Sequence, residues 1–240
     1  MLINIYSYFD LNLRTVKLNL PIYIKRTIKN NKSLICYRTP QSIIYNLILL
    51  LPMAYISYYF SLADAGFYAL ARTALVLPAT ILGKSITDVL YPKVVNSIHT
   101  KSSIKYYLNK FTLYLVVLNL IPLIILYLCG DKIFGLAFGE KWEVAGSYAI
   151  WIYMWVFMFL INKPYSAVIT SFKLESYFLI NTVYGFILLL VALLIISFCQ
   201  LDIVEAVAII SIFTALPQLM IVFYVGAKIK IYEIGLLKNN

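Results

Sequence analysis

The chain alternates between long apolar runs and short polar stretches. A helix needs about 20 mostly apolar residues to cross a bilayer, and six runs are long enough. We predict membrane helices at Ile43–Ala63, Gly66–Tyr91, Phe111–Cys129, Gly146–Ser171, Tyr177–Cys199 and Ile203–Gly226. The pattern therefore predicts an all-α, polytopic bundle of six transmembrane helices.

Proline interrupts five of these six runs, at Pro52, Pro78, Pro122, Pro164 and Pro217. Proline removes a backbone donor, and its ring clashes with the carbonyl one turn earlier, so it bends or locally opens a helix. Single prolines are common in membrane helices. Their presence in five runs favours bent helices around an internal cavity.

Composition supports a membrane protein and argues against a nucleic-acid partner. The 240 residues are 62% hydrophobic and 12% charged, with a mean hydropathy of +0.87. Soluble domains contain about 25% charged residues. The net charge of +10 comes from basic residues near the ends of apolar runs, which is the pattern of membrane topology rather than of a nucleic-acid surface.

The basic residues are distributed unequally between the two sides of the membrane. One side carries seven in residues 1–41, four in 93–110, Lys173 and three in 228–238, whereas the opposite loops carry only Lys132 and Lys141. Because positive loops stay inside, we expect both termini to be cytoplasmic. We divide the chain into a basic cytoplasmic linker (1–41), the six-helix bundle (42–228) and a cytoplasmic tail (229–240).

The segment GDKIFGLAFGEKW lies between the third and fourth runs. Its charged residues predict a structured outer loop. Gly135 and Gly139 have GxxxG spacing, but in a charged loop this spacing does not indicate a membrane dimer.

The second run keeps Arg72, Lys84 and Asp88, although a charge costs about 2.5–3.5 kcal/mol at the centre of a membrane helix. At about 100° per residue, these charges share one half of the helix with Gly83 and three threonines. Apolar side chains occupy the other half, apart from Ser85. The polar half should therefore face a water-filled cavity or a partner helix.

Structural roles remain open for some of these charges. Lys84 and Asp88 are four residues apart near the cytoplasmic end and can form a purely structural pair. Lys163, next to Pro164, can reach the interface by snorkelling. Arg72 lies deeper in the predicted membrane span, and its polar neighbours favour a position facing the cavity over snorkelling. We name Arg72 as the principal substrate-binding candidate, Lys84 and Lys163 as secondary contacts, and Asp88 as a counter-ion or proton-coupled group.

A cavity with more cations than acids suits an anionic substrate. Phosphate is the natural candidate because a guanidinium group matches its oxygens in a bidentate fork. Cys36, Cys129, Cys199 and His99 are isolated in the sequence. We therefore expect no metal site and no cofactor.

Two blocks of the sequence resemble Wzx-type oligosaccharide flippases, within the multidrug/oligosaccharidyl-lipid/polysaccharide exporter superfamily. The first block runs from residue 37 to residue 93 and carries Pro40, Leu51-Pro52, Gly66-Phe67-Tyr68, Ala71-Arg72, Leu77-Pro78, Gly83, Ser85 and Pro92. The second, FGEKWEVAGSY, carries Phe138, Gly139, Trp142, Ala145 and Gly146. The resemblance covers residues 38 to 226, to the C-terminal half of such a flippase.

The resemblance implies a non-enzymatic protein of the bacterial inner membrane. It implies translocation of an undecaprenyl-pyrophosphate-linked oligosaccharide repeat unit, of the kind that builds O-antigen or capsule, by alternating access between two bundles. Because this chain supplies one bundle, its expected partners are an N-terminal transmembrane bundle or a second copy, besides membrane lipid and the substrate. The alternatives are half of a drug/cation antiporter, a membrane-embedded glycosyltransferase or acyltransferase, and a truncated remnant without transport activity.

Overall fold

The six predicted membrane helices are present in the structure. This computed structural model describes residues 32–169 and 171–238, with side chains from residue 36 to residue 235. The helices are α2 (Lys32–Tyr59), α3 (Leu62–His99), α4 (Ile104–Phe138), α5 (Glu143–Ile169), α6 (Glu175–Cys199) and α7 (Ile203–Lys238), with a 3-10 turn η1 (Glu140–Trp142) before α5. Each of the six is long and apolar enough to cross a membrane. The all-α fold class is confirmed.

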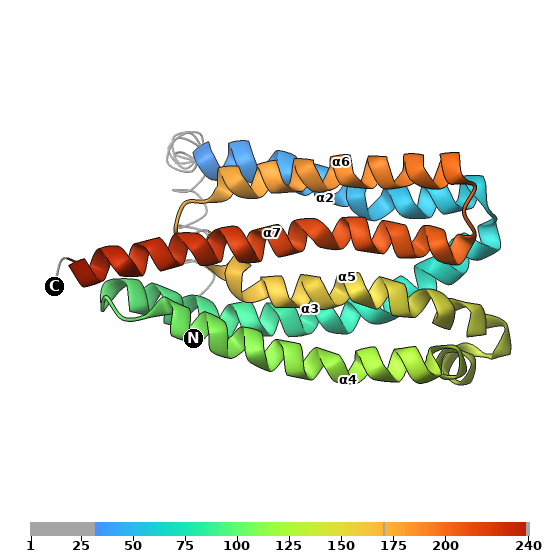
Figure 1. Cartoon of the computed structure of the whole chain (residues 1–240), viewed down its shortest axis with the longest axis horizontal. Coiled ribbons are helices and arrows are strands. Elements are labelled where there is room, and N and C mark those ends of the chain that lie inside the picture. The colour runs from blue at the N-terminus through green and yellow to red at the C-terminus, as the bar shows by residue number, and fades with distance from the viewer. Residues whose placement is uncertain (1–31, 170, 239–240) are drawn as a thin grey trace, which may run out of the picture.

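The helices lie side by side, and consecutive helices run in opposite directions (Figure 1). The central helix is α5, which packs against α3, α4 and α7, while α6 packs against α2 and α7. The start of α2 and the end of α7 lie at the same end of the bundle (Figure 1). We call this the α2-start end, and the opposite one the η1 end.

Burial separates the central helix from the peripheral ones. Over the most apolar window of each helix, 56% of residues are buried in α5, against 17% in α4 and 11% in α2. Large apolar side chains on α4, such as Tyr127 and Leu136, point away from the bundle with 77% and 92% of their surface exposed. Surfaces of this kind suit lipid rather than water, so the chain is a multi-pass membrane protein.

Two main clusters of buried apolar residues hold the bundle together. The cluster towards the η1 end gathers around Tyr148, Ala149 and Ile152 of α5 and includes Ala65 of α3. The other gathers around Val168 and Ile169 of α5 with residues of α3, α4 and α7. Both clusters include α5, so this one helix links the two ends of the core.

The five prolines predicted within spans all lie inside helices: Pro52 in α2, Pro78 in α3, Pro122 in α4, Pro164 in α5 and Pro217 in α7. Helix α4 also departs from helical geometry at Cys129, with φ −140° and ψ 17°. This break separates the last turns of α4 from the rest of the helix.

The prediction of a loop for GDKIFGLAFGEKW is wrong over most of this segment. Residues 130–138 continue α4 as a helix, which ends at Gly139 with φ 102°. Glycines allow this continuation, since a Cβ on Gly146 of α5 would lie only 2.4 Å from the Cα of Asp131. Asp131 and Lys132 suggested a loop because they are charged, but both are exposed at the end of the bundle.

Polar contacts fix the helix ends. Ser61 caps α3 and donates to Asp64, whose other carboxylate oxygen accepts from Tyr148 of α5 at 3.0 Å. At the α2-start end, Glu233 of α7 accepts from the Ser103 hydroxyl and the Lys105 amide, each at 2.9 Å.

Two helices extend beyond the predicted limits of the six-helix bundle, residues 42 and 228. Helix α7 continues to Lys238, past residue 228 where the predicted bundle stops, and α2 begins at Lys32, before residue 42. Residues 1–31 of the predicted linker lie outside the described residues.

The close approach of α4 and α5 generates a stability prediction. Gly146→Ala would place a methyl group against the α4 backbone, which cannot move aside as a side chain can. We expect a loss of about 1–3 kcal/mol and a lower melting temperature of the purified protein in detergent. Gly66→Ala in α3 is the control, because a Cβ there meets nothing within 4 Å. An unchanged melting temperature for Gly146→Ala would contradict the packing.

Candidate functional site

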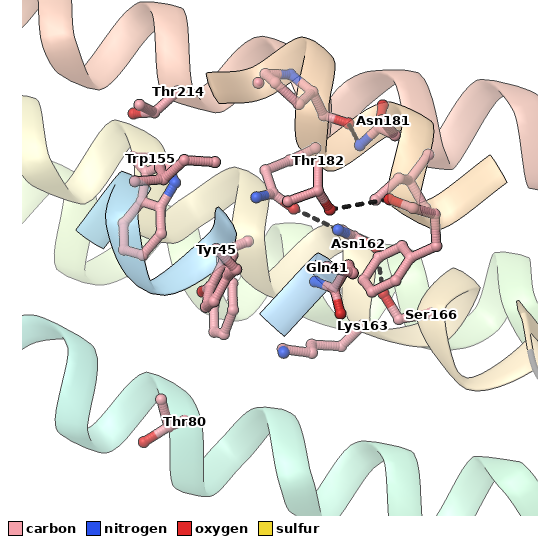
Figure 2. A pocket seen from close by; sticks show the side chains of 17 residues that line it. Gln41, Tyr45, Thr80, Trp155, Asn162, Lys163, Ser166, Asn181, Thr182 and Thr214 are labelled. Atoms are coloured by element: carbon pink, nitrogen blue, oxygen red, sulfur yellow. Dashed lines mark hydrogen bonds between the residues drawn. The ribbon is translucent and has the colours of Figure 1, made fainter. Parts of the chain in front are cut away.

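A cavity of about 350 Å³ lies among α2, α3, α5, α6 and α7 (Figure 2). We call it the polar cavity. Its lining residues are Gln41, Tyr45, Ile48, Thr80, Trp155, Phe159, Asn162, Lys163, Ser166, Phe178, Asn181, Thr182, Gly185, Thr214, Pro217, Gln218 and Ile221. Most of those on α2, and all of those on α6, lie in the first half of the helix, and most of those on α5 lie in its second half. The polar cavity is therefore nearer the α2-start end, which the charge distribution predicts to be cytoplasmic.

A cluster of amide and hydroxyl groups joins α5 to α7 at the polar cavity. The Asn162 side-chain amide donates to the Gln218 side-chain carbonyl, and the Ser166 hydroxyl donates to the Asn162 side-chain carbonyl (Figure 2). Asn162 is buried, and burying an amide in an apolar core is costly unless it forms hydrogen bonds. These contacts fix its orientation beside Lys163.

Other neutral polar groups complete the lining. Asn181 of α6 donates to the Pro217 carbonyl at 3.1 Å, which ties α6 to α7. The hydroxyls of Thr182 and Thr214 donate to carbonyls of their own helices at 2.9 and 2.7 Å, so their oxygen lone pairs remain able to accept. Gln41 is buried on α2 and reaches the cavity from that side (Figure 2).

Aromatic rings form much of the remaining wall. Tyr45 comes from α2, Trp155 and Phe159 from α5, and Phe178 from α6. The Trp155 and Phe159 rings are stacked, with centroids 5.5 Å apart and planes 25° apart. Such rings provide rigid, flat surfaces between the polar groups.

Lys163 supplies the charge of the polar cavity. It lies on α5 and is half-buried, and its Nζ is 3.7 Å from the centroid of the Phe159 ring. An ammonium group at this distance is attracted by the negative face of the ring. Among the described lining residues, Lys163 is the one cationic side chain, and none of them is acidic.

Arg72, the principal candidate from the sequence, lies beside the polar cavity but does not line it. Its Nη1 donates to the Leu49 carbonyl of α2, three residues before Pro52. Its guanidinium carbon is 6.0 Å from the centroid of the Tyr68 ring and 5.9 Å from that of Trp155. Arg72 thus links α2, α3 and α5, and it lines a smaller neighbouring pocket that shares Trp155 with the polar cavity.

Lys84 and Asp88 lie exposed on α3, away from the polar cavity. The structural pair that the sequence left open for these two residues does not form in the described part of the chain. Thr73 is also exposed on this helix, whereas Thr80 lines the polar cavity and Gly83 is buried. This bundle therefore covers the predicted polar half of α3 only in part. Of the four predicted site residues, the structure brings Lys163 into the polar cavity and leaves the other three outside it.

Sequence reasoning missed the neutral residues that make up most of the site. Asn181, Thr182 and Gln218 interrupt the apolar runs of α6 and α7, and polar residues inside membrane helices usually face a cavity or a partner helix. The sequence therefore contained a signal for these three residues. It contained none for Gln41 and Tyr45 of α2, because they reach the cavity only through the packing of α2 beside α6.

The fold and the site define a class: a multi-pass, all-α membrane protein with a polar cavity that contains one lysine among neutral polar and aromatic side chains. Within that class, a family model described as polysaccharide biosynthesis protein matches residues 8–147. The match covers more than half of the chain, and the protein belongs to this family. No curated protein and no solved structure matches the chain.

The family match and the polar cavity overlap in part. The matched residues 8–147 contain the lining residues of α2 and α3, and they end early in α5. Lys163 and the rest of the α5, α6 and α7 lining lie beyond the match.

Proposed function

We propose that the protein translocates undecaprenyl-pyrophosphate-linked oligosaccharide repeat units across the bacterial inner membrane, as the C-terminal part of a flippase. The observation that carries this proposal is the composition of the polar cavity. One lysine stands among amides, hydroxyls and aromatic rings, without an acidic side chain among the described lining residues. Membership of the polysaccharide biosynthesis family supports a substrate of this class.

The chemistry of the lining suits both parts of such a headgroup. Sugar hydroxyls donate and accept hydrogen bonds, as do the side chains of Gln41, Asn162 and Gln218. The ammonium of Lys163 suits a phosphate oxygen. The volume of about 350 Å³ is that of a small-molecule site. In the proposed mechanism it receives the headgroup, while the prenyl chain stays in the bilayer.

The lining argues against export of a cationic drug. A cation needs an acidic or strongly electronegative partner in a low-dielectric site. Acidic residues on the helices that form the cavity lie outside it: Asp64 bonds to Ser61 and Tyr148, Asp88 and Glu205 are exposed, and Glu175 does not line the cavity. A lone lysine would repel such a cargo.

The exposed charged residues of α3 are explained by the same proposal. Lys84 and Asp88 are exposed within a helix that spans the membrane, and such charges are costly against lipid. We propose that this face borders a second bundle, either an N-terminal one or a second copy. Anion binding by Arg72 and Lys84, with Asp88 as a counter-ion or proton-coupled group, then stays a prediction for the two-bundle state.

The charge distribution generates a topology prediction. In a background with Cys36, Cys129 and Cys199 replaced by serine, Glu140→Cys in η1 should react with a membrane-impermeant maleimide in intact cells. Ser102→Cys, exposed between α3 and α4 at the opposite end, should react only after permeabilisation. The reverse pattern would contradict the proposed orientation.

The role of Lys163 generates a transport prediction. Lys163→Gln keeps a polar side chain and removes the charge. A hydrogen bond to a charged group is worth about 1.5–3 kcal/mol, so transport should fall about ten- to hundredfold. The measurement is surface polysaccharide in bacteria whose chromosomal copy carries the substitution, at matched protein abundance in the membrane.

A second lysine provides the matched control. Lys110→Gln removes a positive charge from the same end of the bundle, at an exposed position on α4 outside the polar cavity, and should leave surface polysaccharide unchanged. Wild-type polysaccharide from Lys163→Gln would remove the main support for anion binding in this cavity.

A further inference from the structure

Gly83 of α3 leaves the space that the side chain of Lys163 occupies. A Cβ on Gly83 would lie 2.9 Å from Cε, 3.1 Å from Cγ and 3.2 Å from Cδ of Lys163. These are the three nearest atoms to such a Cβ, and all belong to the aliphatic part of one side chain. The lysine therefore packs directly on the α3 backbone where a side chain is missing.

Close approach of two helix backbones does not explain this glycine. At Gly146, the atoms that a Cβ would meet belong to the α4 backbone, so glycine there sets the distance between helices. At Gly83 they belong to a flexible side chain that could take another path. What Gly83 determines is the path of Lys163.

The other end of Lys163 is held by its own helix. Phe159 lies one turn earlier on α5, and its ring centroid is 3.7 Å from the ammonium nitrogen. The side chain is therefore bracketed by the backbone of α3 at its aliphatic part and by an aromatic ring at its charge. A lysine has many rotamers, and restricting them in advance lowers the entropy lost when a ligand binds.

We infer that Gly83 is a positioning residue, which acts through Lys163 to hold the ammonium group at the polar cavity. The inference rests on the proposed function for the identity of the ligand, but the position of the lysine can be tested without one. Gly83→Ala adds one methyl group and leaves every charge in place. It should displace the lysine from the cavity wall.

The binding test uses the full chain in nanodiscs, with undecaprenyl pyrophosphate as the probe. A displacement of about 1 Å can be costly to a positioned group, and we expect Gly83→Ala to weaken binding about tenfold. In a Lys163→Gln background, the same substitution should change affinity by less than about twofold, since residues that act as a unit are not additive. Equal losses in both backgrounds would overturn the inference.

The second test follows Lys163 itself. Modification of its amine by trinitrobenzenesulfonate, measured residue by residue with mass spectrometry, should become severalfold faster in Gly83→Ala. The rate at Lys110 should not change. An unchanged rate at Lys163 would overturn the inference, whatever the affinity for the probe.

Gly66→Ala is the matched control on the same helix, since a Cβ there meets nothing within 4 Å. It should leave binding and labelling unchanged.

If Gly83→Ala fails to fold, adding Lys163→Ala should restore folding, because it removes the atoms that the new methyl group meets. Failure to restore folding would contradict the inference. If the wild-type protein does not bind undecaprenyl pyrophosphate, the proposed function fails, and the labelling of Lys163 still decides the role of Gly83.

Discussion

The arrangement of the bundle depends on holding one ammonium group inside a membrane helix. A lysine at the centre of a membrane helix costs about 2.5–3.5 kcal/mol on insertion scales. Lys163 lies towards one end of its helix and bears part of this cost, and no acidic side chain among the described cavity residues offsets it. The ring of Phe159 offsets part of it, since a desolvated cation–π contact is worth about 2 kcal/mol. The remainder requires a polar surrounding, which the amides and hydroxyls of α2, α6 and α7 supply. Charge burial thus explains why polar side chains of four helices gather at one place.

The same constraint explains the central position of α5. This helix carries Lys163 and Asn162 at one end of its membrane segment and the Tyr148 cluster at the other. Several of its neighbours approach it closely through glycines or through side chains that bond to it. Gly83 of α3 receives the stem of Lys163, Gly130 of α4 meets the Gly146 backbone, and Gln218 of α7 accepts from Asn162. The polar cavity and the packing of the helices around α5 therefore share residues.

The sequence was sufficient for the fold because the bilayer imposes long apolar runs that are visible without a structure. It failed at residues 130–138, where Asp131 and Lys132 suggested a loop although a helix end exposed to water tolerates the same charges. It identified Lys163 but ranked Arg72 above it, since the Leu49 carbonyl and the Trp155 ring that engage Arg72 belong to other helices. Pairings between helices also determine which neutral residues, such as Gln41 and Asn181, reach one cavity. A single sequence does not contain those pairings.

The most direct test of lipid-linked sugar binding in the polar cavity is to identify what enters this cavity in living cells. The ring of Phe178, which lines the cavity, would be replaced by photoreactive benzoylphenylalanine, and adducts would be identified by mass spectrometry after irradiation. Phe223 on α7, with 74% of its surface exposed on the outside of the bundle, would be the comparison position. Entry of the lipid-linked sugar into the polar cavity predicts adducts of a sugar-bearing prenyl pyrophosphate at Phe178 and of ordinary phospholipid at Phe223. Adducts at Phe178 that contain only phospholipid, in cells that accumulate the lipid-linked sugar, would contradict it.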